Sequence, residues 1–331
     1  MEVAVTGEEV PSDILEAAFE EIVAGEASAL SIGALLVALR TRGETVGEIV
    51  AAARVLRAHA ETAPSPDPRT VDTCGTGGDG MQTFNISTTA AFVVAGAGVP
   101  VAKHGNRAAT SRSGSIDVLE ALGVGVDLSV EESAEILSEV GIAPFFARRA
   151  HPAMRFVAPV REQLGIRTIM NCLGPLLNPV GVRFQLVGVY AANLVEPLAM
   201  ALGELGAERA LVVHGSDGMD EVTTTGSTHA ALWAGDHLDV LEIDPGDVGL
   251  PRSVPGSLRG GDAGENAKIT RAVLEGETGA RRDIVLINTA AALWVAGACA
   301  DLGEGMEQAR ESIDSGAARR RLDRLVAVAA R

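Results

Sequence analysis

Apolar side chains recur every three to four positions between residues 13 and 62, which predicts a helical region. In its first helix the apolar positions are Ile14, Leu15, Phe19, Ile22 and Val23. The pair Asp13 and Glu16 predicts a capping box at the start of this helix. A second helix is predicted over 31–43, and Thr45 with Glu48 predicts the cap of a third.

The pattern changes after a proline-rich linker at 63–69, where short apolar runs begin to alternate with helical segments. The runs at 70–74, 99–105, 185–191 and 209–215 predict strands, those at 87–98, 115–123, 129–141 and 196–206 predict helices, and 283–297 predicts a strand running into a helix. Such alternation is typical of an α/β fold with a central, mainly parallel sheet that is covered by helices.

Charge narrows the possible partners. The 331-residue chain has 44 acidic and 27 basic residues and a formal net charge of −17, which disfavours non-specific binding to nucleic acid or to an anionic membrane. Its apolar runs are too short to span a bilayer, and its N-terminus does not resemble a signal peptide. Cys74, Cys172 and Cys299 lie far apart without metal-ligand spacing, which predicts reduced thiols in a cytoplasmic protein.

The stretch DTCGTGGDG at 72–80 carries the first candidate chemistry. Its glycines fit the dinucleotide fingerprint G-x-G-x-x-G, but the acidic residue expected about twenty positions later is missing, since 95–102 reads AGAGVPVA. A P-loop is excluded because no Gly-Lys-Ser/Thr follows. Glycines let the backbone approach a ligand and turn N–H groups toward it, so the loop predicts a phosphate site of another kind.

Polar residues extend this candidate site. Asn85, Ser87 and Thr88 stand where a helix is predicted to begin, and a helix N-terminus is a natural anion site. A tight turn with ordinary capping by Ser87 is the alternative interpretation. The stretch KHGNRAATSRSGS at 103–115 adds positive charge and hydroxyl groups after a second strand, where a solvated surface loop is the alternative.

A pair of adjacent carboxylates, Asp220 and Glu221, follows the strand at 209–215. Adjacent carboxylates in a loop are usually just solvated. Beside two anion-binding loops, however, they indicate a magnesium site, because Mg²⁺ takes oxygen ligands from a few carboxylates and from the phosphates of a substrate.

Five separated segments resemble the anthranilate phosphoribosyltransferase family, in the order found there. They read DTCGTGGDG…TFNIST, KHGNRAATSRSGSIDVLEALG, HPAMRFVAPVREQLGIRTIMNCLGPLLNP, QLVGVY and LVVHGSDGMDEVTTTG. The resemblance implies a small helical domain at 1–66, rejoined by about 165–182, and a larger α/β domain at 67–331 of the nucleoside phosphorylase/phosphoribosyltransferase type. It also implies an active site in the hinge region and a homodimer joined through the helical domains.

The reaction that the resemblance implies is a step of tryptophan biosynthesis. The amine of anthranilate displaces pyrophosphate from C1 of phosphoribosyl pyrophosphate, which gives N-(5-phosphoribosyl)-anthranilate. Because the leaving group is highly charged, catalysis should depend on neutralising it and on aligning the amine with the ribose carbon. The resemblance implies two Mg²⁺ ions per active site, held by Ser87, Asp220 and Glu221.

The resemblance also implies the substrate contacts. Those for phosphoribosyl pyrophosphate are Gly75, Gly78, Asp79, Thr83, Asn85, Ile86, Ser87, Thr88, Lys103, His104, Gly105, Asn106, Arg107, Ala108, Ala109, Thr110, Ser111 and Ser115. Those for anthranilate are Gly75, Asn106 and Arg161. The sequence alone does not single out Arg161, which resembles an ordinary surface arginine of a helix. No general base is evident, and packing or hydrogen bonding explains His104 and His151 at least as well as catalysis.

Two alternatives stay open besides a same-fold phosphoribosyltransferase with another acceptor. Pyrimidine nucleoside phosphorylases share the architecture and also act at a ribose C1, but their glycine and lysine signatures differ from GTGGDG and KHGNR. A nucleic-acid-binding relative without the activity is expected to lose the Asp-Glu pair or to carry a basic face, and this chain does neither.

Overall fold

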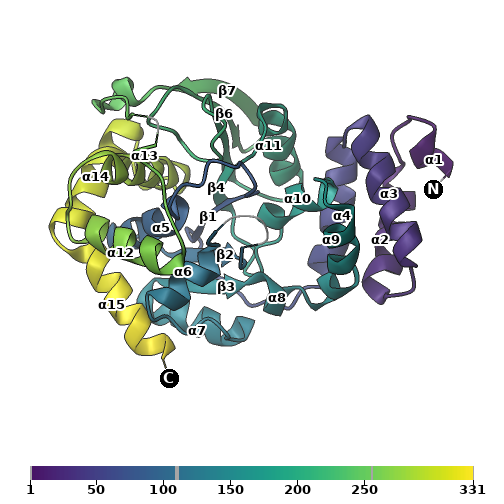
Figure 1. Cartoon of the computed structure of the whole chain (residues 1–331), viewed down its shortest axis with the longest axis horizontal. Helices are drawn as coiled ribbons and strands as arrows, with labels where there is room; N and C mark the ends of the chain where they lie inside the picture. The colour runs from purple at the N-terminus through teal and green to yellow at the C-terminus, as the bar shows by residue number, and fades with distance from the viewer. Residues whose placement is uncertain (1, 109–111, 255, 331) are drawn as a thin grey trace.

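A helical unit lies beside a larger α/β unit in the computed structural model, which describes residues 2–108, 112–254 and 256–330 (Figure 1). The N-terminal helices are α1 (Glu2–Val5), α2 (Ser12–Ala24), α3 (Ala29–Arg42) and α4 (Val46–Ala58). They form one end of the molecule, and the C-terminal helix lies at the opposite end (Figure 1). The helical character predicted for 13–62 is therefore confirmed.

The starts of these helices test the two predicted caps. The capping box of Thr45 and Glu48 is confirmed, since each residue accepts a hydrogen bond from the backbone N–H of the other. The box of Asp13 and Glu16 is wrong: Pro11 occupies the cap position of α2, and no side chain caps it. The helix begins at Ser12, so that Asp13 falls in its first turn, where a carboxylate stabilises the helix dipole.

A seven-stranded sheet forms the centre of the α/β unit. Its strands are β1 (Val71–Gly75), β2 (Val101–Gly105), β3 (Ile142–Phe146), β4 (Phe184–Gly188), β5 (Arg209–Gly215), β6 (Thr228–Ala234) and β7 (His237–Ile243). Their order is β3-β2-β1-β4-β5-β6-β7, with parallel pairing from β3 to β5 and antiparallel pairing from β5 to β7. The mainly parallel sheet is confirmed, and the sequence pattern missed β3, β6 and β7.

The order of the strands places a topological switch point between β1 and β4. The chain runs outward from β1 through β2 to β3, and then returns to the other side of β1 as β4. Loops that leave adjacent strands in opposite directions open a crevice at their carboxyl ends, which is where open α/β sheets bind ligands. The ends of these two strands, Gly75 and Gly188, are paired in register.

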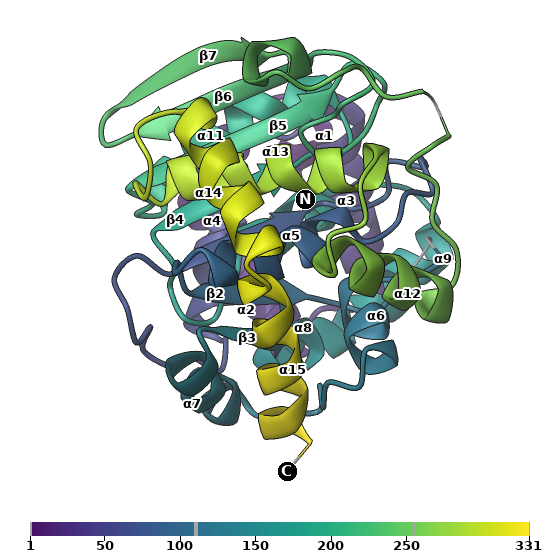
Figure 2. The ribbon, with the colours of Figure 1, turned by 90° about the vertical axis from the view of Figure 1, so that its left-hand side faces the viewer.

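Helices cover both faces of the sheet (Figures 1 and 2). The longer ones are α5 (Ile86–Gly96), α7 (Val130–Val140), α11 (Val195–Glu204), α12 (Ala263–Leu274), α13 (Ala280–Val295), α14 (Leu302–Asp314) and α15 (Ala317–Ala329). The shorter ones are α6 (Ser115–Ala121), α8 (Ala147–Ala150), α9 (Ala158–Leu164) and α10 (Ile169–Leu173), with 3₁₀ turns at Pro152–Phe156, Gly174–Leu176, Ala192–Leu194 and Pro245–Val248. None of the helices in the described ranges has the length and apolar content needed to cross a bilayer.

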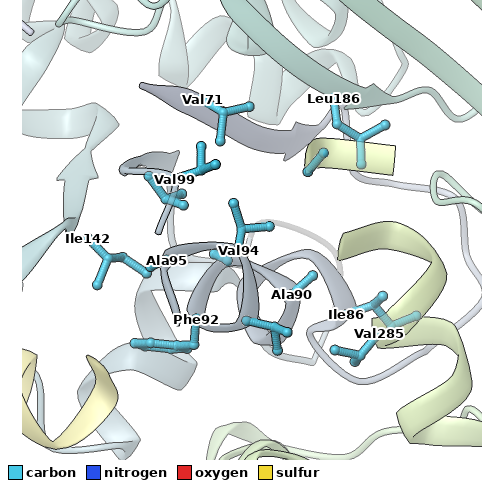
Figure 3. Packing of buried hydrophobic residues seen from close by; sticks show 14 of the residues in the cluster. Val71, Ile86, Ala90, Phe92, Val94, Ala95, Val99, Ile142, Leu186 and Val285 are labelled. Atoms are coloured by element: carbon cyan, nitrogen blue, oxygen red, sulfur yellow. The ribbon is translucent and has the colours of Figure 1, made fainter. Parts of the chain in front are cut away.

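Helix α5 is the centre of the larger hydrophobic core. Its side chains Ala90, Phe92 and Val94 pack between the sheet and the surrounding helices. Val285 of α13 belongs to the same cluster (Figure 3). Because α13 is itself buried over most of its surface, its apolar run lacks the alternation of a surface helix. The strand predicted at the start of 283–297 is therefore wrong, since α13 is one continuous helix.

The opposite face of the sheet packs on the helical unit. A second core cluster joins apolar residues of α2–α4 to those of α9, α10 and α11. It also includes the buried residues on this face of β4 and β5. The guanidinium of Arg57 on α4 crosses this junction, donating to the carbonyls of Leu176 (2.6 Å) and Leu205 (2.8 Å). Burial lowers the pKa of Arg57, whose two acceptors are both neutral.

We expect Arg57→Met to lower the free energy of unfolding by about 2–4 kcal/mol, because two buried carbonyls lose their donor. Arg54→Met is the matched control. Arg54 lies on the same helix, is half-exposed, and has only a distant ion pair with Glu16 at 3.8 Å. Urea unfolding of both variants measures the difference; an equal loss in the two would show that Arg57 does not hold the units together.

Candidate active site

The glycine loop after β1 takes the backbone shape that its sequence predicts. Gly77, Gly78 and Gly80 have φ values of 65°, 76° and 79°, in the left-handed region that other residues rarely adopt. The loop therefore turns sharply over the carboxyl end of β1, at the switch point of the sheet.

Two further glycines allow a second loop to approach. A Cβ on Gly188, at the end of β4, would lie 1.6 Å from the backbone oxygen of Asp220, and a Cβ on Gly75 would lie 2.7 Å from Asp220 Oδ2. The loop after β5, which carries the carboxylate pair, can reach the switch point only because both strands end in glycine.

The two carboxylates bind the surrounding loops together. Asp220 Oδ2 accepts a hydrogen bond from the N–H of Gly77 at 2.9 Å, and Asp79 Oδ2 accepts one from the N–H of Asp220 at 3.4 Å. Glu221 Oε1 accepts from the N–H of Ser87, in the first turn of α5, at 3.0 Å. The glycine loop, the carboxylate pair and the helix N-terminus thus form one site, as the sequence predicts.

The electrostatics of Asp220 and Glu221 favour a bound cation. Burial, followed by the nearby charge of Asp79, raises the pKa of Asp220 to about 7. Burial, followed by the charge of Asp220, raises the pKa of Glu221 to about 8, although Lys103 acts in the opposite direction. Carboxylates held this close favour a shared proton or a bound cation, and their oxygens together with the Ser87 hydroxyl are the hard ligands that Mg²⁺ prefers.

The protein does not enclose such a cation by itself. In the described residues, no three His, Cys, Asp or Glu side chains converge as a metal site. At phosphate sites magnesium is usually held by one or two carboxylates together with water and substrate phosphates.

A buried amide supports the loop of the carboxylate pair from behind. Asn288 of α13 accepts from the N–H of Val222 at 2.9 Å and donates to its carbonyl at 2.8 Å. Asp217, which precedes the pair, is occupied by the Thr223 hydroxyl at 2.7 Å and the N–H of Met219 at 3.1 Å. Asp217 therefore shapes the loop, and nothing in the sequence pattern singles out Asn288.

Lys103 is buried in β2 beneath the site and not exposed in a loop. Its ammonium donates to the carbonyl of Thr73 and to the Ser87 hydroxyl at 3.4 Å. Asp72, where burial raises the pKa and Lys103 opposes that effect, accepts from Asn178 Nδ2 at 2.9 Å. Lys103 thus supplies fixed positive charge below the helix N-terminus, in a water-poor setting where such charge acts strongly.

The loop after β2 is only partly in the predicted arrangement. Arg107 pairs with Glu120 of α6 at 2.8 Å and with Asp117 at 3.3 Å, and its contact with phosphate stays a prediction. Asp117 also accepts from the N–H of Ala108 at 2.8 Å, which holds this part of the loop against α6. The predicted contacts Ala109, Thr110 and Ser111 lie outside the described residues.

Gly105 and Asn106 lead from β2 into this loop, beside the start of α6. A Cβ on Gly105 would lie 2.0 Å from the hydroxyl oxygen of Ser115, the first residue of α6. The carbonyl of Asn106 accepts from the Ser115 hydroxyl at 3.5 Å and from the N–H of Ile116 at 3.3 Å. Both residues therefore lie where β2 ends, at the same edge of the sheet as the glycine loop.

The N-terminus of α5 differs from the ordinary capped helix that was the alternative. Its cap residue is Asn85, not Ser87, and the Asn85 side chain makes no capping hydrogen bond. The N–H of Ile86 donates to the Phe84 carbonyl at 2.8 Å. Thr88 Oγ1 is buried without a partner among the described residues.

Thr83 lies between the glycine loop and α5. It pairs with Arg259 as an isolated antiparallel bridge, and the Arg259 guanidinium donates to Gln82 Oε1 at 3.0 Å. The segment around Arg259 is therefore attached to the end of the glycine loop.

The two histidines form a buried neutral pair. His104 Nε2 lies 3.2 Å from His151 Nε2, and the rings meet edge to face with centroids 5.2 Å apart. Burial lowers the pKa of His104 to about 3 and that of His151 to about 4. Both rings are therefore uncharged at neutral pH, and His104 brings no cation to a phosphate.

Two arginines come from the segment of α9 and α10, which precedes β4 in the chain. Arg161 on α9 is half-buried, burial lowers its pKa, and no residue of the described ranges accepts a hydrogen bond from its guanidinium. Arg167, which the sequence did not single out, donates to the Gly78 carbonyl and stacks on the Tyr190 ring at 4.2 Å. The segment therefore reaches the glycine loop through Arg167.

The comparisons with known proteins agree with this geometry. Residues 67–319 match the family described as "Glycosyl transferase family, a/b domain", and residues 3–60 match "Glycosyl transferase family, helical bundle domain". The anthranilate phosphoribosyltransferase of Rubrobacter xylanophilus is 54% identical over 329 residues, which cover 99% of this chain and 96% of that protein.

Solved structures are similar over nearly the whole chain. Anthranilate phosphoribosyltransferase from Thermus thermophilus is 43% identical with a TM-score of 0.94, covering 99% of this chain and 98% of that one. The Saccharomyces cerevisiae enzyme, in complex with PRPP and Mg, is 30% identical with a TM-score of 0.88, covering 97% and 93%. The same yeast enzyme in complex with 4-fluoroanthranilate is 28% identical with a TM-score of 0.86, covering 96% and 93%.

The fold and the site define a glycosyl transferase with a helical bundle domain and an α/β domain. Within that class, the chain belongs to the anthranilate phosphoribosyltransferase family. The resemblance carried by the five sequence motifs is thereby confirmed.

Proposed function

We propose that this chain transfers the phosphoribosyl group of phosphoribosyl pyrophosphate to the amine of anthranilate, in tryptophan biosynthesis. The observation that carries the proposal is the carboxylate pair Asp220–Glu221, hydrogen-bonded to both the glycine loop and the N-terminus of α5. This is an arrangement for a polyanion with its cation. The yeast relative in complex with PRPP and Mg supports the same assignment.

Each part of the site has a task in that reaction. The anthranilate nitrogen forms a bond to ribose C1 while the C1–oxygen bond breaks, its electron pair leaves with pyrophosphate, and the amine releases one proton. The residues assigned to the phosphoribosyl group are Gly75, Gly78, Asp79, Thr83, Asn85 and Thr88. Lys103 adds positive charge from below.

Ser87, Asp220 and Glu221 fit Mg²⁺ by their donor atoms and by their mutual repulsion, and we propose two ions per site. Magnesium there supplies neutralisation of the leaving pyrophosphate. Holding the amine and the ribose carbon in line would supply a further part of the rate gain.

Anthranilate is assigned to Gly75, Asn106 and Arg161. The half-buried guanidinium of Arg161 has no carboxylate partner within the described chain, which suits the carboxylate of this acceptor. The complex of the yeast relative with 4-fluoroanthranilate supports a site for this class of molecule.

The larger organisation is also proposed. Residues 1–66 with about 165–182 form the helical domain, and 67–331 the α/β domain, as the shared core of α2–α4 with α10 supports. A homodimer through the helical domain is supported by Leu30 and Val37, exposed apolar residues seven positions apart on α3. The three buried free cysteines are consistent with work in the cytoplasm.

The decisive experiment follows anthranilate fluorescence after addition of protein, phosphoribosyl pyrophosphate and magnesium. We expect a decay that requires both the sugar and the metal and that stops when EDTA is added. A decay that needs neither the sugar nor the metal, or no decay at all, would contradict the assignment.

We expect Gly188→Ala to lower this rate by about a hundredfold or more, because its Cβ would lie 1.6 Å from the Asp220 carbonyl and displace the carboxylate pair. Gly33→Ala, within α3, is the matched control. Its Cβ would meet only Val160 Cγ1, at an ordinary contact distance of 3.6 Å. Transfer by the control should equal wild type. Equal rates for both variants would show that the close approach of the loop is not required.

A further inference from the structure

Asn266 of α12 lies outside the predicted substrate contacts but is hydrogen-bonded to one of them. We propose that Asn266 is a positioning residue for the transfer reaction: it holds the side chain of Asn85 away from the N-terminus of α5, so that Asn85 does not cap the Thr88 N–H and this amide stays open to the anionic substrate. The proposal rests on the proposed function, in which Asn85 contacts phosphoribosyl pyrophosphate.

The orientation of the Asn266 amide is fixed by one neighbour. Asn266 is only 1% exposed, so its amide must find its hydrogen-bond partners within the protein. Its Oδ1 accepts from the backbone N–H of Gly261 at 2.8 Å. Since a backbone N–H can only donate, the atom facing it must be the oxygen, and Nδ2 must point the other way. There it donates to Asn85 Oδ1 at 2.9 Å.

The orientation of Asn85 follows from two sides. Its Oδ1 faces the Asn266 donor and also accepts from the Ser113 hydroxyl at 3.2 Å. Its Nδ2 donates at 3.2 Å to the carbonyl of Ser113, which can only accept. A flip of the Asn85 amide would therefore place like groups against each other at both ends. The chain of bonds connects α12 through Asn85 to the loop after β2.

This arrangement diverts Asn85 from the role that its position favours. An asparagine at the cap position usually accepts from the second or third N–H of its helix, which is among the best caps known. Here the side chain makes no capping bond, although it is the cap residue of α5. The Ser87 N–H instead reaches Glu221. Because the Asn85 side chain is bound elsewhere, it leaves the Thr88 N–H, the next amide of the first turn, uncapped.

Packing prevents Asn266 from moving aside. A Cβ on Gly260 would lie 2.6 Å from Asn266 Oδ1 and 2.6 Å from Phe84 Cα, so this segment is tightly packed against both. The segment is also tied to the end of the glycine loop, since the Gly260 N–H donates to the Gln82 carbonyl at 3.0 Å. Gln82 has a φ of 54°, an uncommon conformation for a residue other than glycine.

The test is Asn266→Asp, which keeps the shape and the acceptor for Gly261 but removes the donor to Asn85. We expect KM for phosphoribosyl pyrophosphate to rise on the order of tenfold to a hundredfold, while KM for anthranilate stays unchanged. Asn266→Ala should act in the same direction and serves if the buried carboxylate prevents folding. Thr270→Val is the control, because Thr270 is equally buried on α12 but pairs with Thr89, at 2.9 Å. Its KM values should stay near wild type.

A double-mutant cycle separates positioning from general loosening of α12. If Asn266 acts through Asn85, then Asn266→Ala should add nothing to KM in an Asn85→Ala background. Additive effects, or a KM for Asn266→Asp and Asn266→Ala no higher than for Thr270→Val, would overturn the proposal. Calorimetric binding of phosphoribosyl pyrophosphate without anthranilate distinguishes the failures. Wild type that binds the sugar but does not consume anthranilate overturns only the proposed acceptor.

Discussion

Replacing Asp220 by Asn and Glu221 by Gln in one variant should lower phosphoribosyl transfer about a thousandfold, since charge stabilisation by a metal is worth several kcal/mol. The amides can still accept the hydrogen bonds from Gly77 and Ser87 that shape the site. The variant should therefore fold normally and lose chiefly its magnesium.

The same variant should be more stable than wild type when no metal is present. Burial and like charge raise the pKa values of Asp220 and Glu221, so the ionised pair destabilises the folded state at neutral pH. Neutral amides remove this repulsion, and Tm should rise. Adding magnesium with pyrophosphate should raise the Tm of wild type but not that of the variant, because only wild type binds them.

Asp217→Asn is the matched control from the same loop. Asp217 accepts bonds from Thr223 and Met219 and is given no metal, so its replacement should lower Tm while transfer still responds to magnesium. If Tm rises in the double variant and falls in Asp217→Asn, the effect of losing the metal site is distinguished from the effect of disturbing the loop. If the double variant transfers at the wild-type rate with the same magnesium dependence, the metal assignment is wrong.

How much of the site the sequence predicts depends on whether its parts end parallel strands. The glycine loop follows β1, the loop of Asn106 follows β2, and the carboxylate pair follows β5. Parallel strands bring their carboxyl ends to one edge, so motifs far apart in the chain can be placed together from the sequence alone. The hydrogen bonds from Gly77 and Ser87 to the pair confirm that placement.

The supporting amides could not be predicted in this way. Asn178, Asn266 and Asn288 are buried and join segments that lie 106, 181 and 66 positions away. Within the sequence each is a single asparagine, with no spacing or repeat that marks it. Only the packed structure shows which backbone groups need a partner there.

The arginines show the same limit of the sequence. Arg107 stands in a loop rich in phosphate-binding residue types, yet Glu120 and Asp117 of α6 engage it. Arg167 stands in an unremarkable stretch, yet it reaches the glycine loop. A charge in the sequence indicates a partner of opposite sign, but the fold decides whether that partner is a ligand or the protein.

Arg161 is the residue where that decision has the largest consequence for the acceptor. Its guanidinium is half-buried and has no carboxylate or carbonyl partner within the described chain. A charge in that position is costly unless a ligand pairs with it. The planar fork of arginine matches a carboxylate with two parallel hydrogen bonds, and anthranilate carries such a group.

Arg161→Gln should therefore raise KM for anthranilate by roughly tenfold to a hundredfold, the range expected for hydrogen bonds to a charged group. KM for phosphoribosyl pyrophosphate should not change. Arg161→Lys should recover only part of the loss, because lysine keeps the charge but not the fork. Arg155→Gln is the control, since Arg155 is exposed and stacks on Phe156 at 4.6 Å.

The acceptor itself can be varied to complete the argument. Methyl anthranilate keeps the amine and the ring but has no negative charge, so its competition with anthranilate reports binding without the carboxylate. Wild type should bind the ester much more weakly than anthranilate, whereas Arg161→Gln should bind both about equally. If the variant still discriminates as wild type does, another group recognises the carboxylate, and Arg161 would then be assigned to shaping α9.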